Sequence, residues 1–131
     1  MQVEIIELFD DGRIPNHPGH PLIVYRGAFI ANGSAITATR AIEIFASHDW
    51  AGAWINGIYP FHHYHARSHE VLANVGPRVA VQFGGRSGPH VQFETGDVVA
   101  IPAGGGHCRI EEVSGLAIVG AYPLGQEDWD L

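Results

Sequence analysis

From Ile58 onward the chain consists of short apolar runs, each closed by glycine, proline or other turn residues. Short runs of this kind at regular spacing are typical of β-sandwiches and small barrels. The pattern therefore predicts an all-β fold, a small antiparallel barrel. The runs that we expect to form its strands are 60–66, 69–75, 78–83, 90–94, 97–101, 107–113 and 116–122.

The segment before the barrel has a mixed pattern. Residues 3–9 are predicted to form a short strand, and a loop rich in proline and glycine follows over 10–21. A second short strand is expected at 22–25. One helix is predicted over 35–47, with Ser34 as its N-cap, because apolar residues recur there on a single helical face.

The length of 131 residues fits one domain, and no repeat or linker divides the chain. We expect a barrel core over 57–122 and a C-terminal tail over 123–131. Residues 1–56 are expected to form an arm whose strand and helix pack outside the barrel.

Charge and cysteine content exclude several classes of protein. Seven Lys and Arg residues face 14 Asp and Glu residues, a formal net charge of −7, which argues against nucleic-acid or acidic-membrane partners. The single cysteine, Cys108, rules out an intrachain disulfide. The first residues lack the basic and apolar segments of a signal peptide, so we expect a cytoplasmic protein.

Four of the nine histidines are gathered at positions 62, 63, 65 and 69. The spacing is Gly57, five residues, His63, one residue, His65, four residues and Glu70. Residues i and i+2 of a strand point to the same face, so His63 and His65 are expected side by side. The four intervening residues allow a turn, and Glu70 then returns on the next strand to face them.

A second block follows with the spacing Gly96, five residues, Pro102, one residue, Gly104, two residues and His107. A turn, a strand over 98–101 and a tight loop are predicted to deliver His107 from a distant strand. Three imidazoles and one carboxylate suit a divalent transition metal such as Mn, Fe, Co, Ni or Zn. A solvated polar strand without a metal is the alternative for the first block.

Neighbouring residues are separated by strand parity. His62 and His69 have the opposite parity to the expected ligands and are predicted to face outward. Arg109 lies two residues beyond His107 and shares its inward face. It either binds a substrate carboxylate in bidentate fashion or pairs with an internal acid.

The two blocks resemble the two sequence motifs of the cupin superfamily, which are small β-barrels of the jelly-roll type. His63, His65, Glu70 and His107 match the metal ligands of that family position by position. One departure is Pro77, which stands where the first motif normally ends in glycine.

Three further segments are similar to a small bacterial cupin family typified by YjlB. They are residues 60–65 (PFHHYH), 69–72 (HEVL) and 119–123 (VGAYP). This resemblance implies a single-domain cupin and specifies no reaction.

The cupin resemblance implies a metal-dependent protein that acts on a small polar metabolite. Oxygenase, isomerase, lyase and decarboxylase activities remain open, because only the metal ligands are marked by the sequence. The alternatives are a non-catalytic metal-bearing cupin that binds a small ligand, and a barrel with a purely structural metal. Small cupins are commonly dimers, and the apolar N-terminal strand can pair with another sheet edge, so a homodimer is expected.

Overall fold

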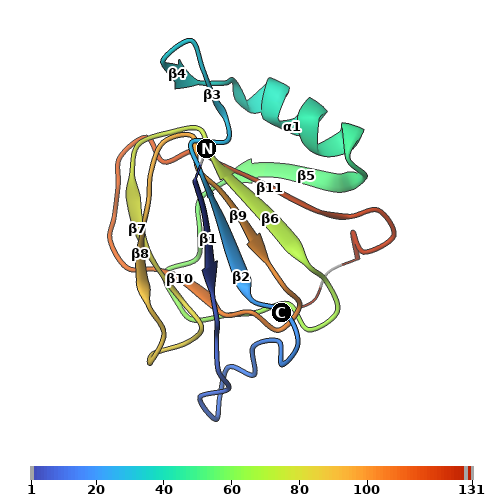
Figure 1. The fold of residues 1–131 in the computed structure, drawn as a ribbon, viewed down its shortest axis with the longest axis vertical. Helices are drawn as coiled ribbons and strands as arrows, with labels where there is room; N and C mark the ends of the chain where they lie inside the picture. Colours follow the sequence, from blue (N-terminus) through green and yellow to red (C-terminus); the bar gives the residue numbers. More distant parts are fainter. Residues whose placement is uncertain (1, 129, 131) are drawn as a thin grey trace.

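Two antiparallel sheets face each other across an apolar core in the computed structural model, which describes residues 2–128 and 130 (Figure 1). Residues 129 and 131 of the predicted C-terminal tail, and residue 1 of the arm, lie outside this description. The strands are β1 (Gln2–Ile6), β2 (Leu22–Arg26), β3 (Ile30–Ala31), β4 (Ser34–Ala35), β5 (Trp50–Asn56), β6 (Glu70–Asn74), β7 (Val79–Phe83), β8 (His90–Phe93), β9 (Val98–Ile101), β10 (His107–Arg109) and β11 (Ile118–Pro123), and the helix is α1 (Ala38–Ser47).

The larger sheet has six strands in the order β1-β2-β9-β6-β11-β5, and the smaller has the order β10-β7-β8. Strands β3 and β4 form a separate hairpin. Neighbouring strands pair in antiparallel fashion throughout both sheets. The predicted all-β antiparallel fold with one helix outside it is therefore confirmed. No helix in the described part of the chain is long and apolar enough to cross a membrane.

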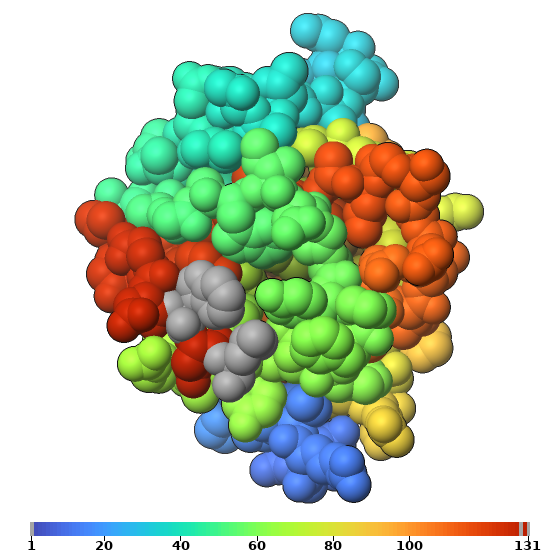
Figure 2. All heavy atoms as spheres, turned by 180° about the vertical axis from the view of Figure 1, so that it is seen from behind, coloured from blue at the N-terminus to red at the C-terminus, as the bar shows by residue number. Residues whose placement is uncertain are grey.

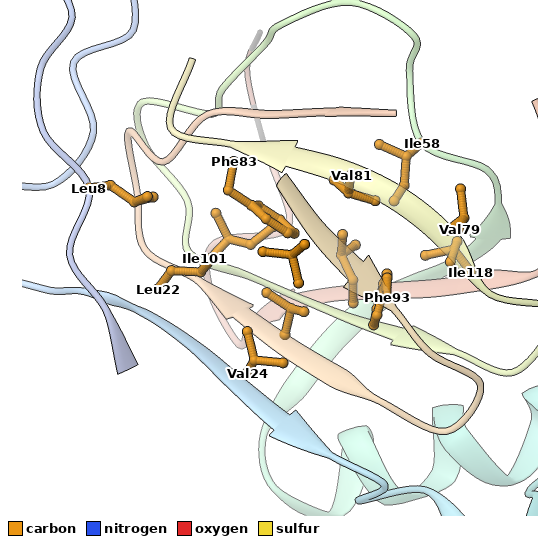
Figure 3. Close-up of a cluster of buried hydrophobic side chains, with 13 residues drawn as sticks. Leu8, Leu22, Val24, Ile58, Val79, Val81, Phe83, Phe93, Ile101 and Ile118 are labelled. Atoms are coloured by element: carbon orange, nitrogen blue, oxygen red, sulfur yellow. The ribbon is translucent and has the colours of Figure 1, made fainter. Parts of the chain in front are cut away.

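Strand alternation divides the apolar residues into two clusters. On β6, Leu72 points between the two sheets, whereas Val71 and Ala73 point to the opposite face, beneath α1. Glu70 has the parity of Leu72, so its carboxylate points into the space between the sheets. Figure 3 shows the cluster between the sheets. Its buried members are Leu8, Leu22, Val24, Ile58, Leu72, Val79, Val81, Phe83, Val91, Phe93, Val99, Ile101 and Ile118.

The helix covers the outer face of the six-stranded sheet, where Ala41 and Phe45 are buried (Figure 1). It begins at Ala38, and the side chain of Thr37 caps it by accepting a hydrogen bond from the Arg40 amide at 3.1 Å. The predicted start at residue 35 and the predicted Ser34 cap are therefore wrong. Ser34 is instead paired with Ala31 in the β3–β4 hairpin.

Strands from the N-terminal arm belong to the six-stranded sheet, contrary to the expected packing outside a barrel. β1 pairs with β2 along its whole length, and β2 pairs with β9. β5 pairs with β11 and was not predicted, because it contains Gly52 and lacks a regular alternation of buried and exposed residues.

Strand β1 forms one edge of this sheet. Val3 and Ile5 on it are 48% and 67% exposed. The sequence analysis predicts that this apolar edge pairs with a second copy of the chain. The homodimer stays a prediction.

Candidate metal centre

The structure brings the four predicted ligands together between the two sheets. One ring nitrogen each from His63, His65 and His107 lies within 4.8 Å of the others. The Oε1 atom of Glu70 lies 3.4 Å from Nε2 of His65 and 3.3 Å from Nε2 of His107. All four side chains are buried.

The four residues come from both sheets and from the segment that links β5 to β6. Glu70 opens β6 in the larger sheet, and His107 opens β10 in the smaller one. The predicted strand over 60–66 is wrong, because its pairing is limited to one bridge, between His63 and His107. Through that bridge the two residues exchange backbone hydrogen bonds of 3.3 and 3.0 Å.

Backbone carbonyls determine the tautomer of all three histidines. Nδ1 lies 3.1 Å from the Phe61 carbonyl in His63 and 3.2 Å from the Gly105 carbonyl in His107. In His65 it contacts the Asp130 carbonyl. A carbonyl oxygen only accepts, so each Nδ1 carries the proton and, in the neutral ring, each Nε2 presents its lone pair. This is the arrangement typical of metal-binding histidines.

A second group of histidines has the opposite arrangement. The rings of His17, His20 and His69 lie 4.5 to 6.2 Å apart. Nδ1 of His69 accepts a hydrogen bond from the Ala103 amide at 2.8 Å, and Nδ1 of His17 accepts from the amides of Gly19 and His20. The neutral rings of His17 and His69 therefore carry their proton on Nε2, which leaves no lone pair there for a metal.

Neither His62 nor His69 belongs to the cluster, and both are half-buried where the sequence predicts outward-facing side chains. His62 lines a separate hollow beside Arg13, Arg86 and Cys108.

Burial and mutual contacts shift the pKa values of Glu70, His63 and His65. Burial alone raises the pKa of Glu70, but His107 and His65 outweigh burial and lower it to about 2. Burial and the charge of His107 lower the pKa of His63 to about 4. For His65, burial is outweighed by the Glu70 carboxylate, which raises the pKa above its ordinary value of 6.5.

The donor set fits a metal cation. With the three rings neutral, Oε1 of Glu70 has no hydrogen-bond donor among the described residues. Leaving this buried carboxylate oxygen without a donor is costly, and the ring nitrogens of the three histidines converge beside it. A divalent transition metal satisfies all four at once.

A tyrosine beside Glu70, and a tryptophan that contacts this tyrosine, were not singled out by the sequence. Trp54 Nε1 donates a hydrogen bond to Tyr122 Oη at 2.9 Å. Burial and the charge of Glu70 raise the pKa of Tyr122, so the phenol stays protonated. Gly120 permits this arrangement, because a Cβ atom there would lie 2.2 Å from the Trp54 ring.

The C-terminal tail holds the loop that carries His65. The Asp130 carboxylate accepts hydrogen bonds from the amides of Ala66 and Arg67 at 2.9 and 3.2 Å. Gln126 accepts from the Ser68 hydroxyl and the His69 amide, both at 2.9 Å. The sequence offers no signal for these contacts, which join residues about 60 positions apart.

A cavity of about 740 Å³ opens beside the four ligands. Figure 2 shows the hollow on the face bordered by residues 52–60 (green) and 113–116 (orange). Arg109 lines this cavity together with His107, as their shared strand parity predicts. The cavity gives small molecules access to the histidine cluster.

Comparison with known proteins gives one relative and one structural neighbour of note. No protein-family model matches the chain. The sequence is 42% identical over 116 residues to the uncharacterized protein YjlB of Bacillus subtilis strain 168, a match that covers 88% of this chain and 67% of YjlB. The structure is similar to acireductone dioxygenase from Bacillus anthracis with a cadmium ion in its active centre, with a TM-score of 0.50 and 12% identity. That match covers 81% of this chain and 79% of the other, and at this identity it shows the fold alone.

Proposed function

Because the chain belongs to the family of small bacterial cupins that includes YjlB, we propose that it is a metal-dependent enzyme acting on a small polar metabolite. In this proposal His63, His65, Glu70 and His107 hold one divalent transition metal ion. The observation that carries the proposal is the tautomer of the three histidines, each of which donates Nδ1–H to a carbonyl. Nε2 of His65 and of His107 faces Glu70, and a ring nitrogen of His63 lies within 4.8 Å of theirs.

A metal ion held by these four residues would supply Lewis-acid chemistry to a substrate oxygen. The protein's own groups then define the rest of the site. Tyr122 keeps its proton beside Glu70, and Trp54 donates to its oxygen. Arg109 lines the cavity as the substrate-binding cation.

The cavity favours catalysis over a purely structural metal. Structural metal sites are closed by protein ligands, whereas catalytic sites keep an open position. All four proposed ligands line the 740 Å³ cavity, so a small molecule entering it reaches them directly.

A turnover screen tests the catalytic proposal. Protein loaded in turn with Mn, Fe, Co, Ni or Zn is incubated with small carboxylates, enolisable carbonyls and sugar derivatives, and products are followed by mass spectrometry. We expect turnover with at least one metal and none in the metal-free protein. Compounds that bind without turning over would contradict the enzyme and favour a ligand-binding module.

An Asp130→Ala variant is expected to bind metal about 10–100-fold more weakly, the usual effect of losing a group that orients a ligand. The change removes the acceptor for the Ala66 and Arg67 amides and frees the loop that carries His65. Asp130→Asn keeps an oxygen at the same place and is the matched control. Competition with a chelator measures both dissociation constants, and equal values for the two variants would contradict the role of the carboxylate.

Metal affinity is expected to fall as the pH drops, beginning above pH 6.5. The pKa of His65 is raised above its ordinary value of 6.5, so this ring holds a proton that a metal must displace. Glu70 stays ionised at neutral pH, because its pKa is lowered to about 2. Calorimetric titration at pH 6, 7 and 8, in buffers of different ionisation enthalpy, counts the protons released. An affinity that stays constant over this range would contradict the assignment.

A further inference from the structure

We propose that the substrate of this site is a small carboxylate with an apolar body, whose carboxylate binds Arg109 while its other end faces the histidine cluster. This inference rests on the proposed function, since it assigns the cavity beside the metal ligands to a substrate.

Arg109 is a half-buried cation with no acidic partner among the residues that the structure describes. Its Nε donates to the Ile58 carbonyl at 3.1 Å, and its Nη1 donates to the Glu111 carbonyl at 3.0 Å. Both acceptors are neutral, and no carboxylate of the described residues lies within ion-pair distance of it. The Glu111 side chain is engaged elsewhere, accepting from the Ala80 amide at 2.8 Å.

The two carbonyls hold the guanidinium in place and leave most of its donors available. A guanidinium has five N–H groups in a planar fork, of which these contacts use two. The remaining donors suffice for a bidentate carboxylate, the partner whose geometry matches the fork. Because these two hydrogen bonds already orient the guanidinium, Arg109 loses less side-chain entropy when a ligand binds.

The position of Arg109 relative to His107 sets the size of the ligand. The two residues stand two positions apart on β10, which separates their Cα atoms by about 6.6 Å. One small molecule can therefore reach both groups. The cavity volume of about 740 Å³ lies within the range usual for small-molecule sites.

The lining of the cavity favours an anion with an apolar body. Apart from Glu70, its described lining contains no acidic side chain, so a bound metal together with Arg109 makes the interior positive on a chain of net charge −7. An anion is thus favoured inside and a cation is not. The apolar side chains that line it include Trp54, Ile55, Ile58, Leu72, Val113 and Leu116.

Binding of three matched probes to the metal-loaded protein tests this inference. The probes are 3-phenylpropionate, its neutral amide 3-phenylpropanamide, and acetate, which keeps the charge and lacks the body. Quenching of tryptophan fluorescence reports occupancy, since Trp54 lines the cavity. We expect 3-phenylpropionate to bind at least tenfold more tightly than the amide, because a charge-assisted hydrogen bond to the guanidinium is much stronger than a neutral one. We expect a similar preference over acetate, because only the phenyl body buries apolar surface in the cavity. Equal binding of the acid and the amide would overturn the proposal.

Two variants separate this inference from the metal site. Arg109→Met is expected to weaken binding of 3-phenylpropionate about tenfold or more, to leave the amide unchanged and to keep the metal content of the wild type. Arg109→Gln retains a donor for the Ile58 carbonyl and serves if Arg109→Met fails to fold. Wild-type affinity for the acid in a folded, metal-loaded variant would overturn the role of Arg109, whereas absence of metal from the wild-type protein would instead contradict the proposed function.

Discussion

His107→Ala is expected to lose most of its bound metal, with an affinity more than about 100-fold below that of the wild type. Partners that only orient a ligand already cost 10–100-fold when removed, so loss of a direct ligand exceeds this. His107 is also the residue that links the two halves of the site, through its bridge to His63 and its contact with Glu70 at 3.3 Å. Elemental analysis of the purified variant measures the effect.

His62→Ala and His69→Ala are the matched controls and should keep their metal. Each removes an imidazole within two residues of a proposed ligand, yet neither ring belongs to the cluster. Nδ1 of His69 accepts from the Ala103 amide, which gives the ring the tautomer unsuited to Nε2 ligation. Metal loss in either control, or full occupancy in His107→Ala, would contradict the assignment.

Phe83→Ala is expected to lower the free energy of unfolding by about 3–5 kcal/mol, the usual cost of truncating a buried phenylalanine. Phe83 is fully buried in the cluster between the sheets (Figure 3) and lies opposite His107 in the pairing of β7 with β10. The cavity left behind therefore opens beneath the strand that presents a proposed ligand. Urea unfolding of the metal-free protein measures the loss separately from any effect of metal.

Phe9→Ala removes the same side chain from an exposed position and is the control. Phe9 is 77% exposed, and surface substitutions of this kind usually change stability by less than about 0.5 kcal/mol. A comparable loss in both variants would mean that the space between the two sheets is not the main core of the protein.

The sequence located the candidate site better than it located the strands around it. Ligand spacing predicted the gathering of His63, His65, Glu70 and His107, although the strand expected to hold the first two is reduced to one bridge. The spacing of the two motifs predicts the site because its fixed positions are those of residues that share one site. The local backbone is set by long-range contacts, such as the hydrogen bonds between the tail and the loop at 65–69, which no local pattern contains.

Long-range contacts also explain why the predicted and observed elements differ in the N-terminal half of the chain. Ser34 and Thr37 are both good N-cap residues, and the choice between them depends on the pairing of β3 with β4. Strand β5 lacks a clean alternation because Gly52 interrupts it, and its place in the sheet depends on pairing with β11. The partnership of Trp54 with Tyr122 follows from that pairing and from Gly120, so it too lies beyond local patterns.

Anomalous diffraction from crystals of the purified protein, recorded at the absorption edge of the metal that elemental analysis finds, tests the metal site most directly. We predict one anomalous peak per chain, in contact with Nε2 of His63, His65 and His107 and with the Glu70 carboxylate. A peak held instead by His17, His20 and His69, or a protein that binds no transition metal at the four-residue cluster, would contradict the account.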